Sequence, residues 1–77
     1  MTDDDFEVQS VSVEFVRKHA TVTILGTRGE AKYQLVARHI PFDPDDEANE
    51  HEIREAAVKE AKRLMAAAAY VKAPKGP

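Results

Sequence analysis

The chain of 77 residues contains no cysteine and no tryptophan, and it has only three phenylalanines and two tyrosines. Without cysteine, it can form neither a disulfide bond nor a zinc site with thiolate ligands. No apolar run approaches the length needed to span a membrane. The first residues are acidic, where a signal peptide would be basic and then apolar. These absences predict a cytoplasmic domain that does not engage a membrane.

A chain of this length has room for one domain, and its stability margin is thin because so small a domain buries only ~60% of its unfolded surface. We predict a single domain over residues 1–77, with flexible tails at 1–5 and 73–77. The formal net charge of −3 argues against nucleic-acid binding through overall charge, although it leaves a local basic patch open.

Three stretches of alternating apolar and polar residues predict β-strands, at about 6–15, 20–24 and 31–40. The apolar phase changes between Val8 and Val11, so we expect either a bulge near Ser10 or the true start of the strand there. Two glycines between Leu25 and Glu30 predict a hairpin loop there. Such short connections join neighbouring antiparallel strands.

A long helix is predicted from Asp43 to Lys72, with Asp43 as the N-cap and Pro44 at the first helical position. Apolar residues three or four positions apart form one stripe from Ile53 to Val71. This stripe must pack on the preceding strands. The predicted fold class is therefore α+β: a three-stranded antiparallel β-meander followed by one long C-terminal α-helix packed on one face (β-β-β-α).

The predicted core residues share the inward phase of each element. They are Val11, Val13, Phe15, Ala20, Val22, Ile24, Tyr33, Leu35, Ile53, Ala57, Ala61, Leu64 and Val71. Alanines on the inward side of the helix predict a close approach between helix and sheet. The other sheet face is expected to be polar, without a large apolar anchor, and to carry Ser12, Glu14, Thr21, Thr23, Lys32 and Gln34.

Acidic residues are concentrated around the predicted start of the helix. They are Asp43, Asp45, Asp46, Glu47, Glu50, Glu52 and Glu55. Acids in the first turn stabilise a helix by interacting with its dipole, but Glu50, Glu52 and Glu55 follow that turn. We keep two interpretations. The acids serve helix electrostatics, or they form an acidic face that binds a basic partner and imitates a row of phosphates.

No catalytic residue, cofactor site or metal site is predicted. The only serines, Ser10 and Ser12, lie in a predicted strand, and no convergent Ser–His–Asp set is visible. The carboxylates from Asp43 onward would suit calcium or magnesium, but Ala48 and Arg54 occupy the positions where an EF-hand loop needs glycine and glutamate. We therefore predict that the protein is not an enzyme.

A basic patch is the alternative site. A meander places the turn Arg17–His19 at the same end of the sheet as the finish of the third strand, so Arg17, Lys18 and Arg38 are expected to be neighbours. Such a patch could hold phosphates and so bind nucleic acid. The acids from Asp43 onward start at the same end and would compete for these cations.

The last turns of the helix carry Met65 and then four alanines, 66–69. Alanine favours a helix by itself, so one interpretation is an exposed final turn. The other is a close helix contact through Met65 and Ala69, with a partner protein or with a second copy in a homodimer. The free edges of a three-stranded sheet would also allow a dimer.

Three strands followed by an alanine-rich helix, with Ala56–Ala57 and Ala66–Ala69, resemble the C-terminal part of a double-stranded-RNA-binding domain. The resemblance implies the same order of elements. That family holds phosphates with lysines at the start of this helix, where this chain has Asp43–Glu47, and its first helix has no counterpart here. No RNA-binding residue is therefore carried over.

Together these features predict a small acidic module that acts by binding another macromolecule, with a protein as the expected partner. An inhibitor or adaptor fits this class, for example a phage-encoded protein that blocks a host nucleic-acid enzyme. A nucleic-acid-binding domain that uses Arg17, Lys18 and Arg38 is the alternative.

Overall fold

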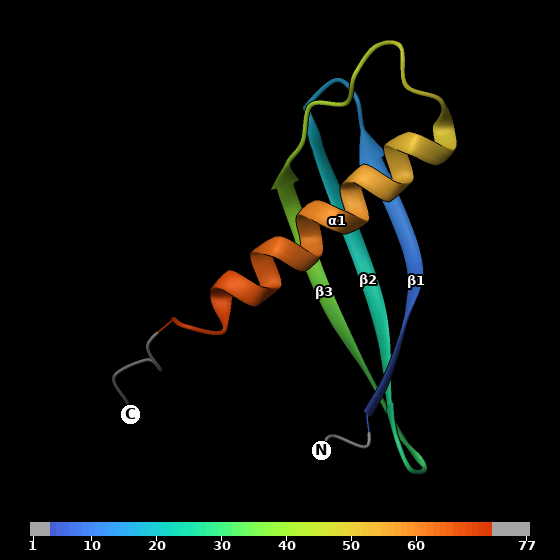
Figure 1. Cartoon of the computed structure of the whole chain (residues 1–77), viewed down its shortest axis with the longest axis vertical. Coiled ribbons are helices and arrows are strands. Elements are labelled where there is room, and N and C mark those ends of the chain that lie inside the picture. The colour runs from blue at the N-terminus through green and yellow to red at the C-terminus, as the bar shows by residue number, and fades with distance from the viewer. Residues whose placement is uncertain (1–3, 72–77) are drawn as a thin grey trace.

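The computed structural model describes residues 4–71 and contains four elements: β1 (Asp4–Glu14), β2 (His19–Arg28), β3 (Ala31–Pro41) and α1 (Glu50–Ala68). The strands form one antiparallel sheet in the order β1-β2-β3. Helix α1 crosses one face of this sheet obliquely, from beside β1 to beyond β3 (Figure 1). The predicted β-β-β-α fold is confirmed. Within residues 4–71, no helix is both long and apolar enough to cross a membrane.

Of the two alternatives predicted for the first strand, a bulge or a later start, the structure has the bulge, and it lies where the apolar phase changes. Val8 pairs with Ile24 and Ser10 pairs with Thr23, so Gln9 is the extra residue of β1. Because an extra residue reverses the alternation that follows it, Val8 and Val11 point to the same face of the sheet. The apolar residues of β1 before and after the bulge therefore lie on the face of the sheet that carries the helix.

A second bulge, in β3, was not predicted. Ala20 pairs with Ile40 and Val22 pairs with Ala37, so β3 has one residue more than β2 in this interval. His39 adopts a positive φ of 55° there, which is uncommon for a residue other than glycine. The bulge turns Ile40 toward the helix, and only 3% of Ile40 remains exposed.

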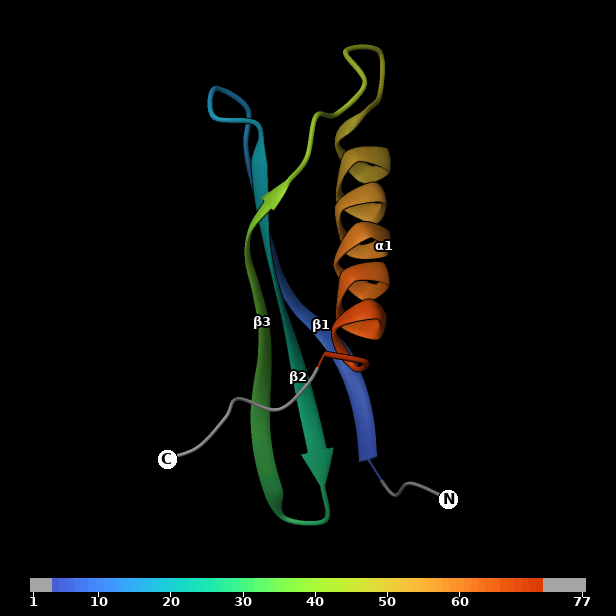
Figure 2. The ribbon, with the colours of Figure 1, turned by 90° about the vertical axis from the view of Figure 1, so that its left-hand side faces the viewer.

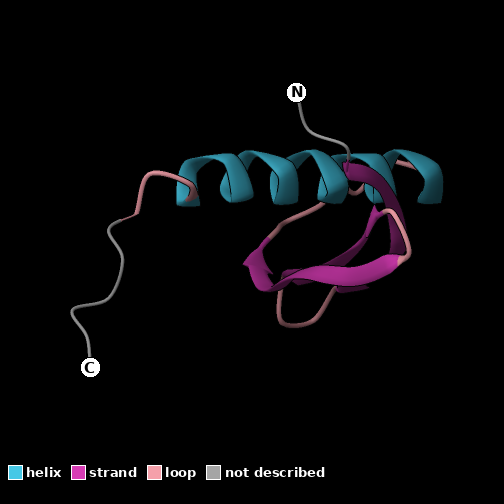
Figure 3. Ribbon diagram, turned by 90° about the horizontal axis from the view of Figure 1, so that it is seen from below, coloured by secondary structure: helices cyan, strands magenta, loops and turns pink. Residues whose placement is uncertain are grey.

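The core lies near the end of the sheet that carries the β1–β2 turn. Its buried apolar residues are Ala20, Val22, Ile24, Ile40, Ala57 and Ala61. Ala57 and Ala61 are fully buried, which confirms the predicted close approach of the helix to the sheet. Figures 2 and 3 show α1 along one side of the twisted sheet, while no other described element covers the opposite side.

The prediction of the core is wrong for three residues, which are exposed. Phe15 lies beyond the end of β1 and is 60% exposed, Leu35 is 41% exposed, and Val71 follows the helix and is 76% exposed. Leu35 is exposed because the oblique path of α1 leaves the β2–β3 hairpin end of the sheet uncovered (Figure 1), whereas Phe15 and Val71 lie beyond the ends of β1 and α1. This uncovered end displays Phe6, Val8 and Leu35 on the helix-facing side.

The predicted start of the helix is also wrong. Asp43 is not the N-cap, because residues 42–49 form a loop and α1 begins at Glu50. Asn49 caps the helix instead: its side chain accepts a hydrogen bond from the Glu52 amide at 2.8 Å. The Glu52 carboxylate in turn accepts from the Asn49 amide at 3.3 Å, which completes a capping box. The helix ends at Ala68, and the predicted end at Lys72 lies outside the described residues.

The hairpin between the second and third strands is tighter than predicted. β2 continues through Gly26 to Arg28, so the connection consists of Gly29 and Glu30 alone. Gly29 has a positive φ of 60°, as two-residue hairpin turns require. At the other terminus, β1 already includes Asp4 and Asp5, which the sequence assigned to a tail, while residues 1–3 lie outside the described range.

Candidate partner-binding site

A groove runs between the outer edge of β1 and the first half of α1. It consists of two adjoining hollows of about 520 and 430 Å³, which share Val11 and Arg54. Apolar side chains line it from both sides: Val8, Val11, Val13 and Phe15 from the β1 side, and Ile53 and Val58 from α1. We call this feature the β1–α1 groove.

The groove results from two features, a bulge in β1 and the angle at which α1 crosses the sheet. The bulge at Gln9 keeps Val8 on the same face as Val11, so the apolar floor extends along the strand. The crossing angle of α1 leaves the floor only partly covered, since Val11 is half-buried and Val8 is 42% exposed. β1 pairs only with β2 among the described elements, so its outer edge, beside the groove that β1 side chains line, has no strand partner.

The rim of the groove is mainly basic. Its charged residues are His51, Arg54, Lys59 and Lys62, together with Glu50 and Glu55. His51 Nε2 lies 2.9 Å from Glu55 Oε1. Within residues 4–71, Arg54, Lys59 and Lys62 form no ion pair. An acidic protein thus carries a local excess of unpaired cations beside an apolar floor.

The next basic residue on the helix is already neutralised. Arg63 Nε donates to Glu60 Oε1 at 3.1 Å, and this hydrogen bond lowers the pKa of the Glu60 carboxyl. A cation that is already paired contributes less binding energy to an incoming carboxylate than an unpaired one does.

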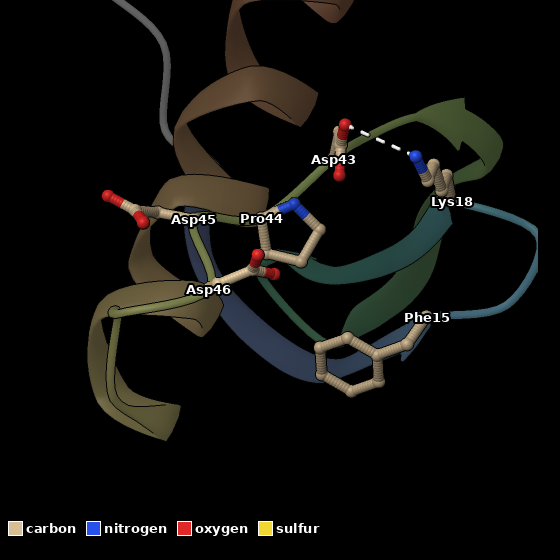
Figure 4. Close-up of a pocket in the computed structure, with 6 residues that line it drawn as sticks. All are labelled: Phe15, Lys18, Asp43, Pro44, Asp45 and Asp46. Carbon is tan, nitrogen blue, oxygen red and sulfur yellow. Dashed lines mark ion pairs between the residues drawn. The ribbon is translucent and has the colours of Figure 1, made fainter.

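The predicted acidic face is divided into two parts by the fold. Asp43, Asp45 and Asp46 line a hollow of about 510 Å³ in the β3–α1 loop, together with Phe15, Lys18 and Pro44 (Figure 4). Lys18 Nζ lies 3.6 Å from Asp43 Oδ2, and Asp45 Oδ1 accepts a hydrogen bond from the Glu47 amide at 3.0 Å. Asp43 and Asp45 therefore have partners inside the domain.

The remaining acids lie on the helix. Glu50 and Glu52 are in the first turn of α1, where they interact favourably with the helix dipole. Glu52 also closes the capping box, and Glu55 pairs with His51. Helix electrostatics and capping account for this second part of the acidic run, and an acidic face that binds a basic partner stays a prediction.

The predicted basic patch is brought together only in part. The backbone amide of Phe42 donates to the carbonyl of Lys18 at 3.0 Å, so the β1–β2 turn lies beside the chain that leaves β3. His19 and His39 are neighbours, with ring centroids 5.1 Å apart. Arg17 and Arg38 are exposed, whereas Lys18 is paired with Asp43. The predicted competition for cations therefore occurs at Lys18.

The predicted helix interface, Met65 and Ala69, is not a single exposed surface. Met65 is half-buried and packs against the core, while Ala69 is the exposed C-cap residue. Ala66 and Ala68 are also exposed. The small residues of the last turns thus lie largely in solvent, as the first of the two interpretations expects.

The strongest charge cluster lies at the uncovered end of the sheet. Arg28 clamps the Asp4 carboxylate with two hydrogen bonds, from Nε at 2.7 Å and from a terminal nitrogen at 2.9 Å. The Tyr33 hydroxyl donates to the same carboxylate. The Arg28 hydrogen bonds first, and then the Tyr33 hydrogen bond, lower the pKa of Asp4 to about 2. Arg28 and Asp4 are also cross-strand partners, so this cluster joins the last pair of the β1–β2 ladder.

The β1–α1 groove was not predicted from the sequence. Its cations Lys59 and Lys62 were not among the predicted site residues. A usable signal existed, because His51, Val58 and Lys62 recur at spacings of seven and four and therefore share one side of the helix. What the sequence could not supply was the crossing angle of α1, which sets that side beside β1.

Comparison of the chain with protein-family models, curated proteins and solved structures finds no match. The resemblance to a double-stranded-RNA-binding domain is limited to the order of elements. In addition, α1 begins with Glu50 and Glu52 after an Asn49 cap, where that family has phosphate-binding lysines.

Proposed function

We propose that this protein is a small interaction module that acts by binding another protein, and that the partner occupies the β1–α1 groove. The observation that carries this proposal is the apolar floor itself. Val8 and Phe15 are 42% and 60% exposed at its two ends, with Val11 half-buried between them. Apolar grooves with a polar rim are the usual sites at which a domain receives a peptide or a partner element.

A protein fits the groove better than a nucleic acid does. Single-stranded nucleic acid binds on aromatic side chains that stack with bases, whereas the floor of this groove is aliphatic apart from Phe15 at one end. The alternative patch at Arg17, Lys18 and Arg38 loses one of its cations to Asp43. An inhibitor or adaptor role in the cytoplasm, including that of a phage-encoded blocker of a host enzyme, belongs to this same proposal.

The test is a selection of random peptides displayed on phage against the immobilised full chain. Two variants block the groove at opposite ends, Val8→Glu and Phe15→Glu. Two matched controls place the same charge elsewhere: Val36→Glu, since Val36 is 44% exposed on the other sheet face, and Val16→Glu, since Val16 is 88% exposed beside Phe15. Circular dichroism verifies that all four variants remain folded.

Selected peptides should bind both control variants as they bind the wild type and should bind both groove variants at least about tenfold more weakly. A single-stranded oligonucleotide should not displace them. A selection that yields no sequence, or only sequences indifferent to Val8→Glu and Phe15→Glu, would overturn the proposal. Displacement by the oligonucleotide would instead favour a nucleic-acid site.

A further inference from the structure

Resting on the proposed function, we infer that the partner presents an extended acidic segment, which pairs with the free edge of β1 as a fourth strand. The juxtaposition behind this inference is an unpaired strand edge that lies directly beside the apolar groove and its basic rim. Strand addition supplies backbone hydrogen bonds for affinity, and alternate side chains enter neighbouring pockets for specificity.

The backbone of β1 provides the first half of the argument. β1 is eleven residues long and is an outer strand of the sheet. Natural proteins usually protect such an edge with a covering element, a proline or a very short strand. β1 has no proline, and its one bulge lies at Gln9. The stretch from Ser10 to Glu14 pairs regularly with β2 beside the groove, so its outer edge offers a regular ladder to an incoming strand.

The side chains of the helix provide the second half. A fourth strand beside β1 would point every second side chain toward α1. Those side chains would meet the apolar floor at Val11 and Val58 and the cations Arg54, Lys59 and Lys62 at the rim. Within residues 4–71 these cations form no ion pair. An incoming strand with small apolar and acidic side chains on one face therefore complements both surfaces.

The other edge of the sheet is a poorer acceptor. β3 carries a bulge with His39 at a positive φ, and it ends at Pro41, which cannot donate to a ladder. Helix α1 extends beyond β3 (Figure 1), but none of the described hollows lies between that end of the helix and the β3 edge. β3 therefore serves as an internal control for strand addition.

A second copy of the chain is not the expected occupant. β1 is itself acidic, but the pairing places Phe6, Val8 and Val13 on the helix-facing side, so Asp5, Glu7 and Glu14 point to the opposite face. Asp4 shares the side of Phe6, and Arg28 already holds its carboxylate. Those acids could not reach the rim cations of another copy. A partner with acids on the helix-facing side is required, and this requirement sets the design of the probe.

The probe is a synthetic peptide with threonine at every second position and valine and glutamate alternating between them. A second peptide replaces the glutamates with lysine, and a third has methylated backbone nitrogens at alternate residues, which removes the donors needed for a ladder. Each peptide is titrated into the isotope-labelled full chain, and amide exchange by NMR reports which strand is covered.

The glutamate peptide should slow amide exchange in β1 by at least about tenfold, because its ladder protects amides on the free edge, and should leave β3 amides unchanged. The lysine and N-methyl peptides should not bind. Lys59→Glu with Lys62→Glu should weaken binding about tenfold, since both rim contacts become repulsive. Lys32→Glu with Arg38→Glu, which changes the net charge equally on the other edge, should leave binding unchanged.

Failure of strand addition, of the acidic partner class and of the proposed function would each give a different result. Peptide binding that depends on Val8 and Phe15 without protection of β1 amides would overturn strand addition while leaving the groove as a partner site. Equal binding of the lysine peptide would overturn the acidic class of partner. Protection of β1 amides that rises with protein concentration alone would assign the edge to a second copy. If the phage selection and all three peptides give no groove-dependent binding, the proposed function fails as well.

Discussion

The ring of Tyr33 lies against the backbone of Gly26, its cross-strand partner in β3–β2 pairing, and a Cβ atom on Gly26 would overlap that ring. The edge of the same ring meets Phe6 from β1, with centroids 6.2 Å apart and planes at 78°. Three strands thus join at one glycine, on the part of the sheet that α1 leaves uncovered. An aromatic ring over a strand glycine replaces the packing that glycine lacks.

Gly26→Ala should therefore lower the free energy of unfolding by about 1–3 kcal/mol, as overpacking does in a close contact. The new methyl group must push the Tyr33 ring away from Phe6 and Asp4. Chemical denaturation measures the loss. In a Tyr33→Leu background the same substitution should cost much less, since the overlapping ring is gone. Equal costs in both backgrounds would show that the glycine serves backbone geometry alone.

The helix start gives a second prediction. Asn49→Ala should lower the free energy of unfolding by about 1 kcal/mol, because Asn49 caps α1 within a capping box. Asp43→Ala is the informative comparison, since its exposed ion pair with Lys18 should contribute at most about 0.5 kcal/mol. Thermal denaturation of the two variants decides the matter. A larger loss at Asp43 would place the true cap where the sequence pattern suggested.

The second bulge makes a third prediction, on core packing. Ile40→Ala should cost about 2–5 kcal/mol, because Ile40 is 3% exposed and its loss leaves a cavity. Leu35→Ala, at a residue 41% exposed in the same strand, should cost about 1 kcal/mol. If Ile40→Ala does not fold, Ile40→Val should still cost about 0.5–1.5 kcal/mol. Equal losses at the two positions would contradict the register of β3.

These comparisons show which parts of the fold could be read from the sequence. The alternation at Ala20, Val22 and Ile24 predicted a buried strand, and all three residues are in the core. The phase change before Val11 predicted either a bulge or the true strand start, and the structure has the bulge. Local patterns were sufficient in these places because strand pairing obeys the same period as the side chains.

Other parts depended on tertiary packing. Asp43-Pro44 is a good helix start, yet Asn49 and Glu52 form a better one. Each of their side chains accepts a hydrogen bond from the other residue's backbone amide, so two amides are satisfied at once. The placement of Ile40 required a bulge at His39, for which alternation gives no signal. The β1–α1 groove depends on the angle of α1 across the sheet, which no local pattern encodes. The candidate site was therefore less predictable than the fold.

The clamp on Asp4 makes stability depend on pH. The pKa of Asp4 is lowered from 3.8 to about 2 in the folded chain, so the folded state favours the carboxylate. The stabilisation is complete above the ordinary pKa of 3.8 and is lost as the pH falls toward about 2. Asp4→Asn should therefore be less stable than the wild type at neutral pH.

The difference in melting temperature between wild type and Asp4→Asn should shrink steadily below pH 3.8 and nearly vanish near pH 2. Glu60, whose pKa is also lowered by Arg63, titrates in both proteins and so cancels in the comparison. A difference that stays constant across this range would mean that Asp4 acts through packing or through register, independently of its charge.

Self-association is the last prediction, and it rests on the uncovered end of the sheet. Phe6 and Leu35 are 56% and 41% exposed there on the helix-facing side, where Leu35 pairs with buried Ile24 and Phe6 pairs with Gly26, two residues further along β2. An 8.6 kDa domain has a small core, so covering these side chains with a second copy would add apolar burial that the monomer lacks. We expect a two-fold dimer through this face, with a melting temperature that rises with protein concentration.

Leu35→Glu should shift the mass measured by light scattering in the micromolar range toward 8.6 kDa, whereas Val36→Glu should leave the dimer intact. The two residues are adjacent and similarly exposed, at 41% and 44%, but they point to opposite faces of β3. Neither lines the β1–α1 groove, so this pair separates self-association from partner binding. A wild-type mass of 8.6 kDa at every concentration would contradict the dimer. Peptide capture at β1 would then be the remaining interaction to pursue, because the β1 edge stays free in a monomer.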